Sequence, residues 1–271
     1  MQMTRFAIII PFRPKAESVH WERECMLLQK SIESILQQTY VHFRVIVVHT
    51  EEPLYRIEDA RVEYHTFPYG FQSYEMISNK EDLFRRFKSQ KMVVRRWDKA
   101  RKLCYASKIA KENNSHYIMA MDADDRISNQ LLEWLAANND RNYCDGWYVD
   151  KGYIHKEGTN YLIRFPRQMR QYNGSTHILR ADLVTIPDFQ SDDWLDYSLF
   201  TDHGWIKDRV KEQFGAVLEP VPFYSLLYFV HESNISQIHQ KQYSFNFKTL
   251  LKRILRRVPL TVALRQEFGV N

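Results

Sequence analysis

The sequence contains no apolar run long enough to cross a membrane. A membrane-spanning helix needs about 18 or more apolar residues, whereas the first apolar run, from Phe6 to Ile10, is closed by Pro11. That run is also too short for the apolar core of a secretory signal. These absences predict a cytoplasmic protein.

Cysteine and glycine are scarce, with three and eight residues respectively. Cys25, Cys104 and Cys144 lie far apart and match no metal-ligand spacing. Cys25 and Cys104 fall on apolar helical stripes, where we expect small buried thiols rather than disulfides. A reducing compartment agrees with this pattern.

Signatures of nucleic-acid binding are also missing. There is no zinc-finger spacing, no ribonucleoprotein signature and no Gly-rich basic tract, so no nucleic-acid partner is expected. The net charge of +5 suits a polyanionic ligand or an acidic membrane surface instead. The 271 residues are enough to bury a substantial core.

Apolar strands and amphipathic helices alternate in the first half of the chain. Phe6–Ile10 and Phe43–Val48 predict two buried strands, and the apolar spacing between His20 and Gln38 predicts a helix. Strand, helix and strand of these lengths predict a βαβ unit with parallel strands, and hence an α/β fold. The other expected elements are strands at 62–67, 117–121, 146–155, 161–165, 176–179 and 222–230, and helices at 97–112 and 202–213.

The strand expected at 117–121 runs directly into Asp122, Asp124 and Asp125. Carboxylates at the carboxyl end of a parallel strand lie where open α/β sheets bind ligands. Three such carboxylates repel one another unless a cation or strong donors neutralise them, and Mg²⁺ and Mn²⁺ prefer oxygen ligands. A metal there could bridge a diphosphate. The alternatives are an acidic turn with Asp125 or Ser128 capping the next helix, and a phosphohydrolase with Asp122 as nucleophile.

Short motifs follow one another in a distinctive order around this cluster. They are Ile10-Pro11, Gln38-Thr39-Tyr40, the second strand and Asp122–Asp125, then Gly174-Ser175, Leu179-Arg180, Gly215, Glu219-Pro220 and Val230-His231. The ordered set, over roughly residues 5–240, resembles the family-two glycosyltransferases. These have the GT-A-type nucleotide-diphospho-sugar transferase fold, an α/β fold whose central, mostly parallel mixed sheet is flanked by helices.

The resemblance implies a metal-dependent glycosyltransferase that moves a sugar from a nucleotide-diphosphate sugar to an acceptor hydroxyl with inversion. Mn²⁺ or Mg²⁺ would be the cofactor, and a glycan or lipid-linked molecule, as in surface glycan synthesis, the acceptor. A domain at 1–240 would comprise a nucleotide-binding half (1–125) and an acceptor half (126–240). The alternatives are a Mg²⁺-dependent phosphohydrolase and a non-catalytic nucleotide or carbohydrate binder on the same fold.

Residue roles can be carried over from the family motifs. Asp122 would contact the nucleotide, Asp124 and His231 the metal, and Asp125 would support the loop or a donor hydroxyl. A core or capping role is the alternative for His231. The other residues that the resemblance places at the nucleotide are Pro11, Arg13, Glu51, Arg101 and Lys102.

The resemblance to the family is less close for two roles, the general base of the reaction and the residue that binds the nucleobase. The resemblance places Asp202 near the carboxylate that takes the acceptor proton, with Asp193 and His203 as further candidates. A helix-capping role competes for Asp202. The second strand ends in His49-Thr50-Glu51-Glu52, where the family usually has Asp-Asp or Asp-Gly, so the preferred nucleotide is left open.

The segment 241–271 is expected to be a basic amphipathic tail. Its apolar residues recur at helical spacing from Phe247 to Val258, with lysines and arginines on the other faces. Such a helix at 245–258 can lie on an anionic membrane, which would place the protein at the inner face of the membrane. A helix docked on the domain is the alternative interpretation.

Overall fold

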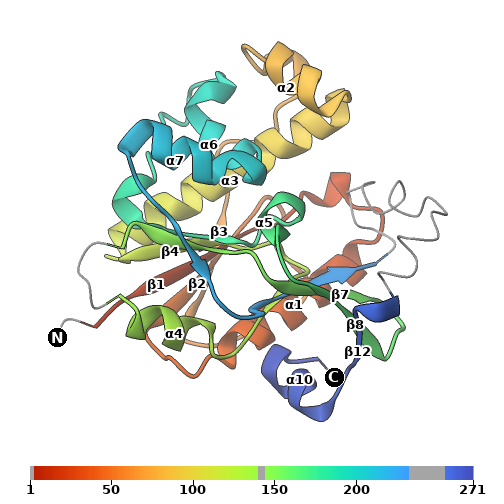
Figure 1. Cartoon of the computed structure of the whole chain (residues 1–271). Helices are drawn as coiled ribbons and strands as arrows, with labels where there is room; N and C mark the ends of the chain where they lie inside the picture. The colour runs from red at the N-terminus through yellow and green to blue at the C-terminus, as the bar shows by residue number, and fades with distance from the viewer. Residues whose placement is uncertain (1–2, 140–143, 232–253, 271) are drawn as a thin grey trace.

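The computed structural model describes residues 3–139, 144–231 and 254–270, which form two β-sheets surrounded by helices (Figure 1). The strands of the larger sheet are β1 (Phe6–Pro11), β2 (Phe43–His49), β3 (Val62–Thr66), β4 (Tyr117–Ala120), β6 (Gly146–Val149), β9 (His177–Arg180) and β10 (Glu219–Val221).

The larger sheet is mostly parallel. Its order is β10-β6-β9-β4-β1-β2-β3. β1 pairs in parallel with both β2 and β4, whereas β9 runs antiparallel to its neighbours β4 and β6. The predicted fold class, an α/β fold with a mostly parallel mixed sheet flanked by helices, is confirmed.

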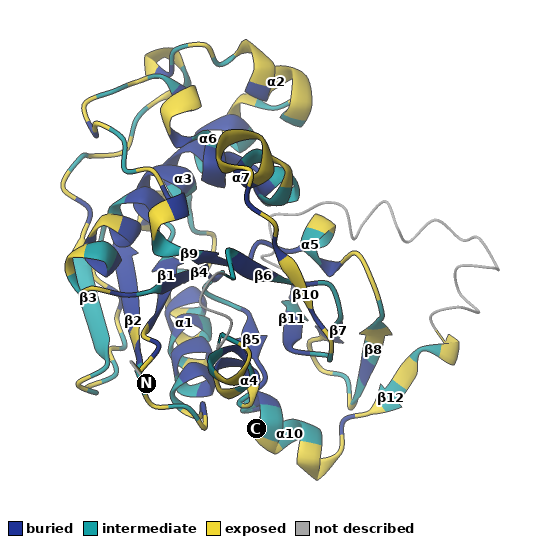
Figure 2. Cartoon of the chain, turned by 60° about the vertical axis from the view of Figure 1, so that its left-hand side comes forward, coloured by how far each residue is buried: buried dark blue, intermediate teal, exposed yellow. Residues whose placement is uncertain are grey.

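Alternate residues of β1 enter the two hydrophobic cores on opposite faces of the sheet. Ala7 and Ile9 pack with the face of α3 (Gln90–Glu112) that carries Trp97, whereas Ile8 and Ile10 pack with α1 (Trp21–Leu36). This alternation is the period of two expected of a strand buried on both faces. Figure 2 shows the central strands as the most buried part of the chain.

Helices cover both faces of the larger sheet. In Figure 1, α3, α6 (Ser198–Thr201) and α7 (Ile206–Phe214) lie above it, with α2 (Glu81–Phe87) at the top, and α1 and α4 (Leu131–Ala137) lie below. α5 (Met169–Tyr172) is a single turn near the second sheet. Across the described ranges, no helix is both long and apolar enough to span a bilayer.

The second sheet has the order β12-β8-β7-β11-β5. Its strands are β5 (Arg126–Ile127), β7 (Gly152–Lys156), β8 (Tyr161–Phe165), β11 (Leu226–Val230) and β12 (Arg257–Pro259). The single strand predicted at 146–155 is therefore wrong, because the chain turns between β6 and β7 and passes from one sheet to the other. Apolar residues on both sides of the turn conceal this break in the sequence.

Residues near the end of the printed sequence pack against the segment that follows the aspartate cluster. β12 pairs with β8, and the carbonyl of Glu267 in α10 (Val262–Phe268) accepts a hydrogen bond from the backbone N–H of Asn129 over 3.0 Å. Arg126 donates a hydrogen bond to the Gly269 carbonyl, and Ser128 donates one to Glu267 over 2.7 Å. Ser128 thus binds α10 instead of capping α4, whose N-cap is Gln130.

Most of the amphipathic stripe predicted at 245–258 lies outside the described residues. In the part that is described, Ile254 and Leu255 are helical, whereas Val258 is in β12 and pairs with Leu162. Ile254 and Leu255, just before this strand, are exposed.

Gly146 is the residue of β6 that approaches β9 most closely. Its φ is +141°, and a Cβ there would lie 2.1 Å from the carbonyl oxygen of Ile178. We expect Gly146→Ala to lower the free energy of unfolding by more than about 2 kcal/mol, because both backbone conformation and space are wrong for alanine. Urea denaturation would measure this.

Gly158 offers a matched control. Its φ is also positive, at +75°, but an added Cβ would meet no atom within 4 Å. Gly158→Ala should therefore cost only about 1 to 2 kcal/mol, the strain of a left-handed residue. Equal losses for the two variants would contradict the steric argument.

Candidate active site

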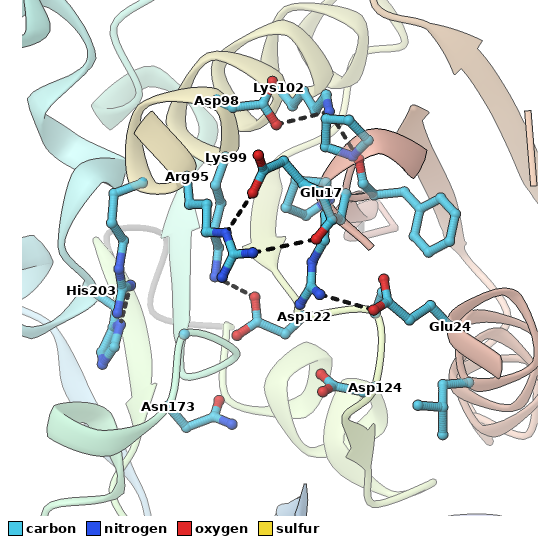
Figure 3. A pocket seen from close by; sticks show the side chains of 18 of the residues that line it. Glu17, Glu24, Arg95, Asp98, Lys99, Lys102, Asp122, Asp124, Asn173 and His203 are labelled. Carbon is cyan, nitrogen blue, oxygen red and sulfur yellow. Dashed lines mark hydrogen bonds and ion pairs between the residues drawn. The ribbon is translucent and has the colours of Figure 1, made fainter. Parts of the chain in front are cut away.

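A pocket opens where the chain changes direction across the larger sheet. β2 and β4 lie on opposite sides of β1, so the carboxyl ends of β1 and β4 meet at a topological switch point, where open α/β sheets bind ligands. The cavity there has a volume of about 190 Å³. Its walls come from the segments after β1 and β4, the start of α3, and the residues around Asn173 (Figure 3).

Each aspartate of the cluster has a different partner. Asp122 forms an ion pair with Lys99, and the Asp124 carboxylate lies 2.9 Å from Nε2 of His231. Asp125 is fully buried and accepts two hydrogen bonds, one from Asn173 over 2.7 Å and one from Ser175 over 2.5 Å. The repulsion expected among three carboxylates is thus relieved by one ammonium, one imidazole and two neutral donors.

These environments separate the protonation behaviour of two aspartates. Burial raises the pKa of Asp125 well above its usual value, and the charges of Asp124 and Asp122 add to this effect. Burial also acts on Asp122, but the ammonium of Lys99 outweighs it and lowers the pKa of this carboxyl. Asp122 is therefore the ionised carboxylate that faces the pocket beside α3.

Helix α3 presents a row of basic side chains to the pocket. Arg95 donates to Glu17 over 2.8 Å, Arg96 lies 3.4 Å from Nδ1 of His203, and Lys99 pairs with Asp122 (Figure 3). None of these three cations was predicted at the nucleotide. Arg95 and Arg96 precede residue 97, where the helix was expected to begin, whereas α3 begins at Gln90. Lys99 lies within the expected helix, and its spacing of three and four residues from Arg96 and Arg95 was the available signal.

Several residues predicted at the nucleotide do line the pocket. Pro11, Arg13 and Lys102 are in its wall, with Arg13 paired to Glu24 over 2.8 Å. Lys102 is completely buried and donates to the carbonyl of Phe12 over 3.0 Å, so it links α3 to the segment after β1.

Two other predicted nucleotide residues lie outside the pocket wall. Arg101 is 1% exposed, donates to the carbonyl of Gly70 and lies over the ring of Phe67. Glu51 accepts a hydrogen bond of 2.8 Å from the backbone N–H of Lys15. Neither side chain is among those that line the cavity.

The three candidates for general base lie in different surroundings. Asp202 is buried, pairs with Arg86 and accepts from the N–H of Gly204, as a capping residue does. Asp193 caps a short helix and accepts from Asn79. Of the three, only His203 lines the pocket.

Two pKa shifts follow from these surroundings. Burial lowers the pKa of His203 to about 4, with Arg96 and Lys99 adding to the effect, so its imidazole is neutral at pH 7. Burial alone would raise the pKa of Asp202, but the bond from Arg86 outweighs it and lowers this pKa.

Asp124 and His231 are the two residues predicted to bind a metal, and their side chains are in contact. In the ranges that the structure covers, no group of three or more histidine, cysteine or acidic side chains could hold a metal ion. Mg²⁺ nevertheless binds in many enzymes through one or two carboxylates, the other ligands being substrate phosphates and water. One carboxylate and one imidazole in contact at the pocket wall fit a Mn²⁺ or Mg²⁺ ion that a phosphorylated substrate completes.

Comparison with known proteins gave structural matches alone. No protein-family model and no curated protein matches the chain. S. aureus TarS 1–349 matches with a TM-score of 0.48 and 11% identity, covering 93% of this chain and 79% of that one. Its complex with UDP-GlcNAc matches with a TM-score of 0.46, 12% identity, and coverages of 99% and 74%.

A putative nucleotide-diphospho-sugar transferase from Desulfovibrio desulfuricans G20 matches with a TM-score of 0.36 and 9% identity, covering 92% of this chain and 94% of that one. The chain spans 44% of the length of the longer S. aureus TarS structure. At these identities the likeness concerns the fold alone.

Proposed function

We propose that the protein is a metal-dependent glycosyltransferase with a GT-A-type fold and a nucleotide-diphosphate sugar as donor. The observation that carries this proposal is the pocket at the switch point, where Asp122, Asp124 and His231 face the basic row of α3. The basic side chains suit a ligand with negative charge at its centre, and the acidic side chains suit a divalent cation that this ligand binds. A nucleotide-diphosphate sugar has this chemistry.

The two ends of the pocket would hold different parts of the donor. The nucleoside would lie at the segment after β1, where Pro11 and Arg13 line the pocket. The diphosphate lies between α3 and Asp124. Asp124 and His231 would hold Mn²⁺ or Mg²⁺, which when bound supplies Lewis-acid stabilisation of the departing diphosphate.

Inversion requires a carboxylate that accepts the proton of the acceptor hydroxyl. Asp202 is our proposed base, since it directly precedes the pocket residue His203 and Arg86 keeps its carboxyl ionised. The proton would pass from the hydroxyl to the carboxylate of Asp202, whose Oδ2 accepts from Arg86 and whose Oδ1 accepts from the N–H of Gly204. The neutral imidazole of His203 can then orient the acceptor by a hydrogen bond.

A panel of nucleotide sugars tests this function. UDP, GDP and dTDP sugars are each added with Mn²⁺ or with EDTA, and the unfolding temperature and the release of nucleoside diphosphate are measured. We expect a metal-dependent rise of several degrees for one class of donor, and slow release of its nucleoside diphosphate. No response to any nucleotide sugar would contradict the proposal, and free phosphate from the same mixtures would indicate a phosphohydrolase.

A further inference from the structure

The ion pair between Lys99 and Asp122 lies in the pocket wall rather than in the core. The two side chains remain 24% and 30% exposed. Gly174 borders the pair, and a Cβ at this position would lie 2.8 Å from Nζ of Lys99 and 3.0 Å from Oδ2 of Asp122. The absence of a side chain at Gly174 therefore lets the ion pair lie directly against the backbone there.

Neither α3 nor the turn that carries Asp122 depends on this ion pair for its position. The backbone N–H of Asp122 donates to Ser175 over 2.8 Å, and Ser175 in turn donates to the buried Asp125. α3 is fixed by its apolar face, which includes the fully buried Trp97. A partly exposed ion pair contributes little to stability, so the pair is better explained by what it does in the pocket.

Two other cations in the pocket wall, Lys102 and Arg95, each donate more than one hydrogen bond to the protein. Lys102 is completely buried between Asp98 and a backbone carbonyl. Arg95 donates two hydrogen bonds to Glu17, one to its carboxylate and one to its carbonyl. Within the described residues, Lys99 forms an ion pair with Asp122 alone. Its long flexible side chain allows the ammonium to move.

We propose that Lys99 binds the diphosphate of the donor and that Asp122 only holds its ammonium while the pocket is empty. This inference rests on the proposed function. When the donor binds, the ammonium leaves the Asp122 carboxylate for the more highly charged diphosphate. The carboxylate of Asp122 is then released to face the metal or the ribose.

Calorimetric titration of Lys99→Met in EDTA tests the diphosphate contact without a metal. The probes are inorganic pyrophosphate and the nucleoside diphosphates ADP, CDP, GDP and UDP, each compared with its nucleoside. We expect the affinity for the diphosphates to fall about 10- to 100-fold, as for a lost charge-assisted hydrogen bond. The affinity for the nucleosides should not change.

Lys108→Met is the matched control on the same helix. Lys108 is on the exposed side of α3, where its nearest acid, Glu112, is 3.9 Å away. This variant removes the same charge and should bind diphosphates as the wild type does. An equal loss in both variants would overturn the proposal, because it would show an effect of net charge alone.

A double-mutant cycle with Asp122→Asn separates direct from indirect action. If Lys99 binds the diphosphate, Lys99→Met lowers diphosphate affinity at least as much in the Asp122→Asn background as in the wild type, because the ammonium no longer has to leave an ion pair there. If Lys99 acts only by positioning Asp122, Lys99→Met has no effect in that background, and the proposal fails. A wild-type protein that binds none of the diphosphates in EDTA would contradict the metal-independent contact of Lys99, whereas no binding with Mn²⁺ either would refute the proposed function itself.

Discussion

Asp124→Asn is expected to reduce transferase activity by a factor of about 1,000 or more. Asp124 is the carboxylate in contact with His231 at the pocket wall, and the charge stabilisation that a bound metal supplies is worth several kcal/mol. Asparagine keeps the size of the side chain but loses its charge. The rise in unfolding temperature on adding Mn²⁺ together with the donor should disappear as well.

Asp182→Asn is a suitable control for this experiment. Asp182 pairs with Arg180 at the surface, its side chain is 66% exposed, and it is remote from the pocket wall. Its replacement should leave both activity and the metal-dependent temperature shift unchanged. Full activity in Asp124→Asn would refute the assignment of Asp124 to the metal and, with it, the mechanism proposed above.

The second large effect concerns stability in mild acid. His177 is 2% exposed in β9, and burial lowers its pKa to about 3, with further contributions from the charges of Arg170 and Lys207. The unfolded chain therefore binds a proton at His177 between about pH 6.5 and 3 that the folded protein does not bind. The free energy of unfolding accordingly falls as the pH drops below 6.5, by about 2 kcal/mol at pH 5 from His177 alone.

Urea denaturation at pH 7 and pH 5 measures this dependence. His177→Phe should reduce the difference between the two midpoints, even if its overall stability is lower than that of the wild type. His20→Gln, a change at an exposed histidine, should leave the difference intact. An unchanged pH dependence in His177→Phe would show that other groups cause the loss in acid.

The parts of the fold that were predictable are those where neighbouring residues alone specify an element. β1 and β2 are apolar runs bounded by polar residues or proline, and α1 carries its buried residues at regular helical spacing, so both patterns indicate their structure directly. The passage from β6 to β7 could not be predicted, because which sheet each strand joins depends on partners more than 60 residues away, such as Leu226 beside Gly152.

The aspartates in the pocket wall were predicted, as were two of its cations, Arg13 and Lys102, whereas Lys99 and Arg95 were not. Asp122 and Asp124 directly follow a buried strand, and this feature can be recognised from the local sequence. Lys99 and Arg95 belong to a helix that is polar on one face, where a solvated position is the usual outcome for any one basic residue. Only the packing of α3 over β1 brings them to the pocket.

The contact between α10 and the segment after Asp125 has a consequence for the order of events during synthesis. Ser128 is held by a residue 139 positions later in the chain. A ribosome releases residues in order, so the turn that carries the aspartates is made long before the helix that secures it. Contacts between such distant residues form late in folding. In the nascent chain the larger sheet should therefore form first. The turn that carries the aspartates should reach its final position only after α10 has been synthesised.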